Sequence, residues 1–275
     1  MQLKVFKPNT PSQRNLIRLN RKGISKKPLL KTKLHGLKNA TGTNNKGQLI
    51  TYHKGGGHKK RYRKLGFPSN LEFVGIVMSI EYDPYRSANI ASVFDINTKQ
   101  YFYVLAAENL IKGDIIKSGK NVEPKNGNSL PLLKIPVGSF IHNISVYQNQ
   151  SPKISKAAGT FSQLIEKTAK FGRVVLSSGE HRLVPINCFA TLGQVSNEFS
   201  FLTTVGKAGR SRWLNKRPVV RGVAMNPIDH PHGGGEGKTS GGRSSVTPWG
   251  KPTKGGSTKK KTNKLIVLNK KGKNI

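Results

Sequence analysis

A segment rich in proline, histidine and glycine, residues 225–239, concentrates the residue types that could do chemistry. It reads MNPIDHPHGGGEGKT and ends in Gly-Lys-Thr, like the phosphate-binding loop of nucleotide hydrolases. That loop also needs an earlier glycine at the position of His232 and a strand in front of it. Pro227 and Pro231 interrupt any such strand. The sequence therefore disfavours a nucleotide-hydrolysing site.

The same segment offers four side chains that bind metals: Asp229, His230, His232 and Glu236. Their spacing matches no helical or zinc-knuckle pattern, and no cysteine lies among them. An enzyme that uses a metal or a nucleotide at this segment remains the alternative hypothesis.

Folded RNA is the partner that the segment fits best. Prolines stiffen the backbone, glycines let another backbone approach closely, and histidines can hydrogen-bond to or stack on bases. A plain flexible linker would not need the Asp-His-Pro-His sequence. We predict a loop inserted into RNA, with Asn226, His230 and His232 in contact with it.

Cationic stretches flank this loop on both sides. Cations pair with phosphates, and arginine also makes bidentate contacts. The only two tryptophans of the chain lie in these stretches, where they could stack on bases or pack locally. The predicted RNA contacts in the flanks are Lys207, Arg210, Arg212, Trp213, Arg217, Arg221, Lys238, Arg243, Trp249, Lys251 and Lys254.

A second basic run, KGGGHKKRYRK, spans residues 54–64. Its glycines allow close approach of a partner backbone, and its cations suit phosphates. The histidines beside it could be simple polar loop residues, but their basic surroundings favour RNA contact. The predicted contacts here, with one arginine from a later turn, are His53, Lys54, His58, Lys59, Lys60, Arg61, Arg63, Lys64 and Arg86.

The charge of the chain is confined to its ends. Residues 1–71 hold 18 basic residues and no acidic one, and residues 199–275 hold 17 basic residues and two acidic ones. Residues 72–198 hold 13 basic and ten acidic residues, within a net charge of +36 for the whole chain. Ends that repel themselves this strongly need a polyanionic partner, and nucleic acid is the usual one.

Several other function classes lose support. No apolar run reaches the roughly 18 residues of a membrane span, so we expect no membrane partner. The single cysteine, Cys188, excludes a disulfide framework, and its apolar neighbours predict a buried, unreactive thiol. No set of carboxylates or Ser, His and Asp residues stands out as catalytic. We expect no enzyme and no cofactor, apart from magnesium ions that accompany RNA.

The near-neutral middle must form the body that holds these segments. Its pattern predicts two sets of short strands, typical of small barrels or sandwiches, with a boundary at residues 126–131. Residues 161–169 could be a short helix by composition, but we favour a strand. Residues 1–52 indicate an irregular extension. The expected strands span residues 73–82, 88–95, 100–105, 111–116, 138–146, 159–167, 173–177, 181–186 and 190–195.

Segments along the whole chain resemble one family. Residues 222–237, GVAMNPIDHPHGGGEG, look like the signature of the large-subunit ribosomal protein L2 family, and residues 53–63 resemble its glycine–histidine–basic loop. The segments EYDP and RSANIA, at 81–91, resemble its first hairpin. IPVG at 135–138, GKAGR at 206–210 and TPWG at 247–250 also match in order.

The resemblance implies a mainly β fold: an OB-type barrel at 72–125 and an SH3-like barrel at 131–203, with long irregular basic extensions at 1–71 and 204–275. It implies a primary rRNA-binding protein of the large subunit that reaches toward the peptidyl transferase region and supports tRNA binding and translation. Neighbouring ribosomal proteins, and the small subunit through an intersubunit bridge, are the implied protein partners, and no homo-oligomer is expected. The family's histidine near that region falls on His230, to which we assign a structural role.

Four positions depart from the family's pattern. Gly66 stands where an acid is usual, Tyr85 where Asn is common, Phe189 where Arg is usual, and Asn215 where Gly is usual. Lysine outnumbers arginine 35 to 13, a bias typical of AT-rich genomes. With no presequence recognised, we expect an organelle-encoded protein of the mitochondrial matrix; plastid stroma and bacterial cytoplasm are the alternatives.

Overall fold

The computed structural model describes all residues except 1–2, 38–40, 67–71, 149, 256–263 and 269–275. The chain divides into two units. Unit 1 consists of residues 1–38, 59–207 and 263–275, and unit 2 consists of residues 39–58 and 208–262. Both ends of the chain therefore contribute to both units.

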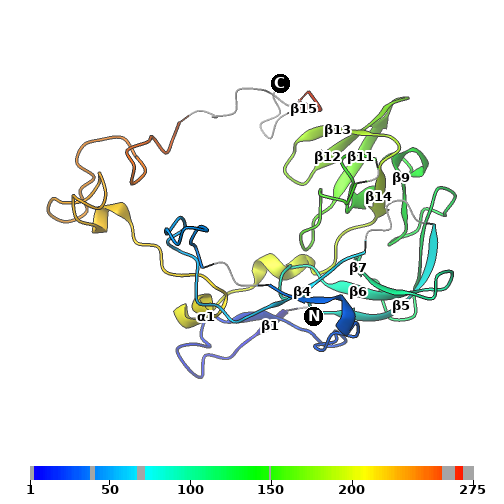
Figure 1. Cartoon of the computed structure of the whole chain (residues 1–275), viewed down its shortest axis with the longest axis horizontal. Helices are drawn as coiled ribbons and strands as arrows, with labels where there is room; N and C mark the ends of the chain where they lie inside the picture. The colour runs from blue at the N-terminus through cyan, green and yellow to red at the C-terminus, as the bar shows by residue number, and fades with distance from the viewer. Residues whose placement is uncertain (1–2, 38–40, 67–71, 149, 256–263, 269–275) are drawn as a thin grey trace. The chain divides into compact units, whose positions relative to one another are not determined.

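Unit 1 consists mainly of strands, as predicted (Figure 1). The prediction of a mainly β protein is confirmed, whereas the closed barrels and the residue boundaries of the domains remain predictions. The strands are β1 (Leu3–Val5), β2 (Ile17–Leu19), β3 (Leu34–Gly36), β4 (Arg61–Arg63), β5 (Phe73–Glu81), β6 (Ile90–Asp95), β7 (Tyr101–Leu105), β8 (Ile115–Ser118), β9 (Ser129–Pro131), β10 (Phe140–His142), β11 (Ser162–Lys167), β12 (Phe171–Leu176), β13 (His181–Pro185), β14 (Phe189–Leu192) and β15 (Ile266–Leu268).

Helical structure is short throughout the described residues. Unit 1 has the 3-10 turns η1 (Lys31–Lys33), η2 (Leu132–Lys134) and η3 (Glu198–Leu202). Unit 2 has the six-residue helix α1 (Ala208–Trp213) and the 3-10 turn η4 (Gly222–Ala224). The other described residues of unit 2 form turns, bends and loops.

Eleven strands of unit 1 form one sheet in the order β15-β13-β12-β11-β10-β14-β9-β8-β5-β6-β7. In β5, alternate residues Phe73, Gly75 and Val77 are buried, because successive side chains of a strand point to opposite faces. Together with Val93 and Ile116, two of these residues belong to the core of the β5–β8 half. Figure 1 shows β12, β13 and β15 side by side at the other end of the sheet order.

The β9–β14 half has its own hydrophobic core. Leu130, Ile141, Leu164 and Val174 are fully buried in it. Residues 161–169, which could have been helical by composition, contain β11, so the strand prediction is confirmed. Ser162 and Leu164 of β11 are buried whereas Gln163 between them is half-buried, and this period of two is that of a strand. Gly172 of β12 lies against Leu164.

The expected boundary at residues 126–131 contains a strand that connects the two sets of strands. β9 lies within these residues and pairs antiparallel with β14 and parallel with β8. Leu130 is fully buried, and its burial compensates for an otherwise loop-like Asn- and Gly-rich sequence. The two sets of strands are therefore joined in one sheet.

The N-terminal extension is more ordered than its sequence indicates. β1 pairs with β2, and β3 pairs with β4. Glu81, buried in β5, accepts hydrogen bonds from the Leu29 N–H (3.1 Å) and the Tyr103 hydroxyl (2.9 Å). The Tyr103 hydroxyl in turn accepts from the Leu30 N–H (2.9 Å). These hydrogen bonds anchor the extension on the sheet. The sequence pattern of residues 1–52 does not predict this anchoring.

Candidate nucleic-acid interface

Unit 2 brings the two predicted basic segments together through their backbones. The Gly55 N–H donates to the Asn215 carbonyl (3.3 Å), the His58 N–H to the Trp213 carbonyl (3.1 Å), and the Arg217 N–H to the His53 carbonyl (2.9 Å). Segments about 160 positions apart thus run side by side, which spacing alone did not predict. This pairing concentrates basic side chains from both ends of the chain in one place.

We call the backbone pairing of residues 53–58 with residues 213–217 the crossing. It depends on Gly57, which lies directly against Asn215. A Cβ at Gly57 would lie 2.6 Å from the Asn215 Cβ, so only glycine fits without a shift. Asn215 has φ of 69°, a left-handed conformation that asparagine tolerates better than most residues. Its side chain accepts a hydrogen bond from the Gly57 N–H (3.3 Å). The asparagine that replaces the family's usual glycine is therefore accommodated.

The 225–239 loop is held by its own histidines. His230 is buried, at 7% exposed, and a Cβ at Gly222 would lie 2.5 Å from its ring. The rings of His230 and His232 stack with centroids 5.1 Å apart. The His232 N–H donates to His230 Nδ1 (3.0 Å), and His232 Nε2 accepts from the Val246 N–H (2.9 Å). These contacts support the structural role that we assign to His230.

The same geometry weakens both alternatives for this loop. His232 Nδ1 lies 3.2 Å from the Ser240 carbonyl, so both of its ring nitrogens have partners inside the protein. Among the described residues, no three His, Cys, Asp or Glu side chains lie close enough to hold a metal ion. A phosphate-binding loop opens a helix, whereas residues 237–255 contain neither helix nor strand.

In unit 1 the basic run meets the turn after β5 through aromatic rings. Tyr62 and Tyr85 form an edge-to-face pair with centroids 5.5 Å apart. Arg86 lies over Tyr62 (5.7 Å from Cζ to the centroid), and Lys60 lies over Tyr85 (6.0 Å from Nζ). Asp83 positions Arg86 through a 3.0 Å ion pair. The two tyrosines, which sequence reasoning did not assign to the site, hold its cations by cation–π contacts.

Near Arg86, one predicted RNA-contact residue is buried, and one lysine that was not predicted lies nearby. Arg63 is only 6% exposed, and its Nη1 donates to the Arg61 carbonyl (2.9 Å), so its guanidinium lies inside unit 1. Lys156 was not predicted. Burial lowers the pKa of Lys156, and the nearby charge of Arg86 lowers it further.

The other predicted contact residues are mostly at the surface of their units. Trp213 is 55% exposed and Trp249 is 70% exposed, so neither tryptophan serves mainly as a core residue. Arg210 is half-buried. The exposed residues are His53, Lys54, His58, Lys59, Arg61, Lys64, Lys207, Arg212, Arg217, Arg221, Asn226, Lys238, Arg243, Lys251 and Lys254. Exposure makes these groups accessible to a partner, and their contacts remain predictions.

The predicted inert cysteine is confirmed. Cys188 is 1% exposed, and burial raises the pKa of its thiol to about 11. Within the described residues, no helix has the length and apolar character that crossing a membrane requires.

A mainly β body with cation-rich, acid-poor ends defines a protein of the nucleic-acid-binding class. Comparison with protein families makes this specific. Residues 30–118 match the RNA binding N-terminal domain of Ribosomal Proteins L2, and residues 125–250 match the C-terminal domain of the same family.

Full-length relatives agree with the domain matches. The chain is 49% identical over 277 residues to the large ribosomal subunit protein uL2m of Reclinomonas americana, covering 99% of this chain and 100% of that protein. It is 47% identical over 274 residues to the large ribosomal subunit proteins uL2 of Rickettsia akari and Rickettsia bellii, covering 98% of this chain and 100% of each relative. The chain belongs to the ribosomal protein L2 family.

Proposed function

We propose that this chain is a structural, non-enzymatic constituent of the large ribosomal subunit that binds rRNA. Family membership supports the assignment, since residues 30–118 match an RNA-binding domain and its relatives are large-subunit proteins. The observation that carries it is the charge imbalance at the ends. They hold 18 and 17 basic residues against two acids, Asp229 and Glu236, so most of these cations can be neutralised only by a partner.

The mechanism is mainly electrostatic. Each phosphate that a lysine or arginine neutralises releases condensed counterions, and this release favours binding. The backbone pairing of the two basic segments in unit 2 sets His53, Lys54 and Arg217 near one another before RNA arrives. Preorganisation of this kind lowers the entropic cost of binding.

The 225–239 loop contributes shape rather than chemistry in this proposal. His230 and His232 hold the loop through stacking and hydrogen bonds, and the loop enters rRNA near the peptidyl transferase region. We further propose contacts with neighbouring ribosomal proteins, a bridge to the small subunit, support of tRNA binding, and neither a membrane partner nor a homo-oligomer. Magnesium ions at this interface would belong to the rRNA.

Selective binding to the large-subunit rRNA tests the proposal. The full-length protein is titrated against large- and small-subunit rRNA from its own source at matched salt. We expect at least about a 1,000-fold preference for the large-subunit rRNA, the lower end of the range of specific over non-specific binding. Equal affinity for the two RNAs would contradict the assignment.

The compartment is a separate part of the proposal. The lysine-rich composition and the similarity to a mitochondrial relative favour a mitochondrial ribosome, in the matrix, over a plastid or bacterial one. Sequencing the genome around the gene tests this. Neighbouring genes of a mitochondrial genome are expected, and a bacterial chromosome or a plastid genome would contradict it.

A further inference from the structure

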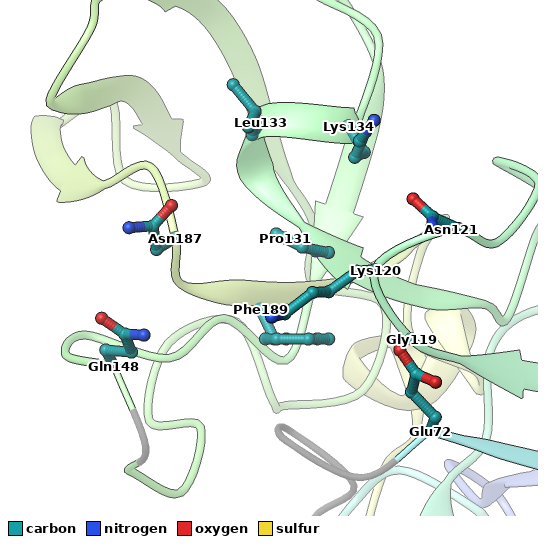
Figure 2. A pocket seen from close by; sticks show the side chains of 10 residues that line it. All are labelled: Glu72, Gly119, Lys120, Asn121, Pro131, Leu133, Lys134, Gln148, Asn187 and Phe189. Carbon is teal, nitrogen blue, oxygen red and sulfur yellow. The ribbon is translucent and has the colours of Figure 1, made fainter.

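Unit 1 contains an open pocket of about 580 Å³ that none of the predicted contact residues lines. It lies where the connection between β8 and β9, the turn η2 and the start of β14 meet (Figure 2). Its lining residues are Glu72, Gly119, Lys120, Asn121, Pro131, Leu133, Lys134, Gln148, Asn187 and Phe189.

The apolar part of the pocket rests on paired backbone. Phe189 and Pro131 are cross-strand partners in β14 and β9. The Phe189 carbonyl accepts from the Ser145 N–H (3.0 Å), and the preceding residue, Cys188, points into the core. The Phe189 ring is therefore held on a rigid part of the sheet and faces the opposite side, where it remains half-exposed.

Polar groups without partners surround this ring. The amides of Asn121, Gln148 and Asn187 are exposed, and within the described residues they make no hydrogen bond. Glu72 contributes a carboxylate on the side of Gly119, as Figure 2 shows. An amide offers two donors and an acceptor, so this rim can match the mixed donor and acceptor pattern of a base edge.

The charge at the pocket is positive. Two lysines, Lys120 and Lys134, and one carboxylate, Glu72, line it. In Figure 2 the side chain of Lys120 extends across the pocket toward Phe189. A cation in this position can pair with a phosphate attached to a group that lies on the ring.

We propose that this pocket binds one unpaired nucleotide of the rRNA, an inference that rests on the proposed function. The base stacks on Phe189, its edge contacts the amides of the rim, and Lys120 pairs with its phosphate. An aromatic ring, unpaired amides and lysines are the groups by which proteins bind unstacked RNA bases. The volume also falls within the usual range of sites for small ligands.

A nucleotide accounts for the pocket better than a segment of a neighbouring protein. Burying three amides under an apolar peptide side chain would leave them without hydrogen bonds, at an energetic cost. A base and its phosphate satisfy both the amides and the cation. Phe189 supplies the aromatic ring on which such a base can stack.

The test compares full-length variants bound to their large-subunit rRNA, using chemical probing of unpaired nucleotides and equilibrium binding. Phe189→Ala is expected to expose a single nucleotide that wild type protects and to weaken binding by about 5- to 150-fold, the range of one lost base stack. Phe189→Tyr keeps the ring and should keep the protection. Phe201→Ala removes a 79%-exposed ring outside the pocket and is the matched control.

Salt dependence separates stacking from a general folding defect. Phe189→Ala should leave the slope of log K against log salt unchanged, whereas Lys120→Ala should make it shallower by about 0.7–0.9, the value for one phosphate contact. The proposal is overturned if the Phe189→Ala protein protects the same rRNA nucleotides as wild type and binds the rRNA with unchanged affinity. It is also overturned if protection at the pocket requires other ribosomal proteins, since a peptide would then be the occupant. Failure of the wild-type protein to prefer large-subunit rRNA would instead refute the proposed function.

Discussion

At the scale of single residues, His142 is the clearest titratable group of the core. It is fully buried, and its Nδ1 lies 2.9 Å from the Gly193 carbonyl. Burial lowers its pKa from 6.5 to about 4, with the hydrogen bond opposing this shift. The imidazole is therefore neutral in the folded protein at pH 7.

This burial predicts a loss of stability in mild acid. Between pH 6.5 and about 4 the unfolded state binds a proton at His142 that the folded state does not, so stability falls as pH falls through this window. The contribution amounts to about 3 kcal/mol. Urea unfolding of wild type and His142→Gln between pH 7.5 and 4.5 isolates it. The difference between the two proteins should shrink toward acid, and a constant difference would contradict the prediction.

Substitution of His230 tests whether this histidine only maintains the conformation of the loop or itself dominates rRNA binding. Its contacts lie within the protein, with Gly222 and His232, so His230→Ala removes packing and a single acceptor. We expect rRNA affinity to fall by about 2- to 12-fold, the effect of one ordinary hydrogen bond. Filter binding to large-subunit rRNA measures this. A loss of more than about 100-fold would show that the histidine dominates binding.

At the scale of elements, the crossing in unit 2 depends on Gly57. Gly57→Ala would force its Cβ against Asn215 and should destabilise the crossing by about 1–3 kcal/mol. Faster amide hydrogen exchange at His58 and Arg217, whose N–H groups form the crossing, is the expected signature. Gly209→Ala is the control, because a Cβ there meets nothing within 4 Å. Equal exchange in both variants would show that the steric argument is wrong.

The elements also show where sequence reasoning succeeds. β5 was predictable because it is a run rich in β-branched and apolar residues, and its buried residues recur with the period of two that a strand imposes. β9 was not, since it is only three residues long and follows the polar, loop-like residues 126–128. β1 to β4 are three residues each and depend on partners far along the chain or on anchors such as Glu81.

The candidate site shows a similar limit. Residue type sufficed to nominate cations and histidines, and most of them lie at the surface. It could not show that Arg63 is buried, that Tyr62 and Tyr85 hold cations, or that Gly57 faces Asn215. Each of these depends on tertiary contacts between segments distant in sequence, which a charge pattern does not encode.

At the scale of the whole molecule, the N-terminal extension should be needed for assembly. Deleting residues 1–64 removes all 18 of its cations together with β1 to β4. We expect the truncated protein to enter few large-subunit particles, measured by sucrose-gradient sedimentation and immunodetection. A normal yield of particles would contradict this.

A variant with fewer lysines shows how much of the extension's contribution to particle assembly comes from charge rather than from its folded structure. Lys22, Lys26 and Lys27 are exposed, so replacing all three by Gln should preserve the fold. If charge is the main contribution, this variant assembles with reduced but measurable efficiency, and lower salt improves it. Full assembly of the triple variant at every salt concentration would argue against a role for these cations.

The central claim is that charge at the two ends drives binding to rRNA. The salt dependence of the affinity of the full-length protein for its large-subunit rRNA tests it most directly. Engagement of about ten phosphates predicts a slope of log K against log salt of about −7 to −9. A slope shallower than about −3 would contradict the account, because so few released counterions could not explain why both ends are so basic.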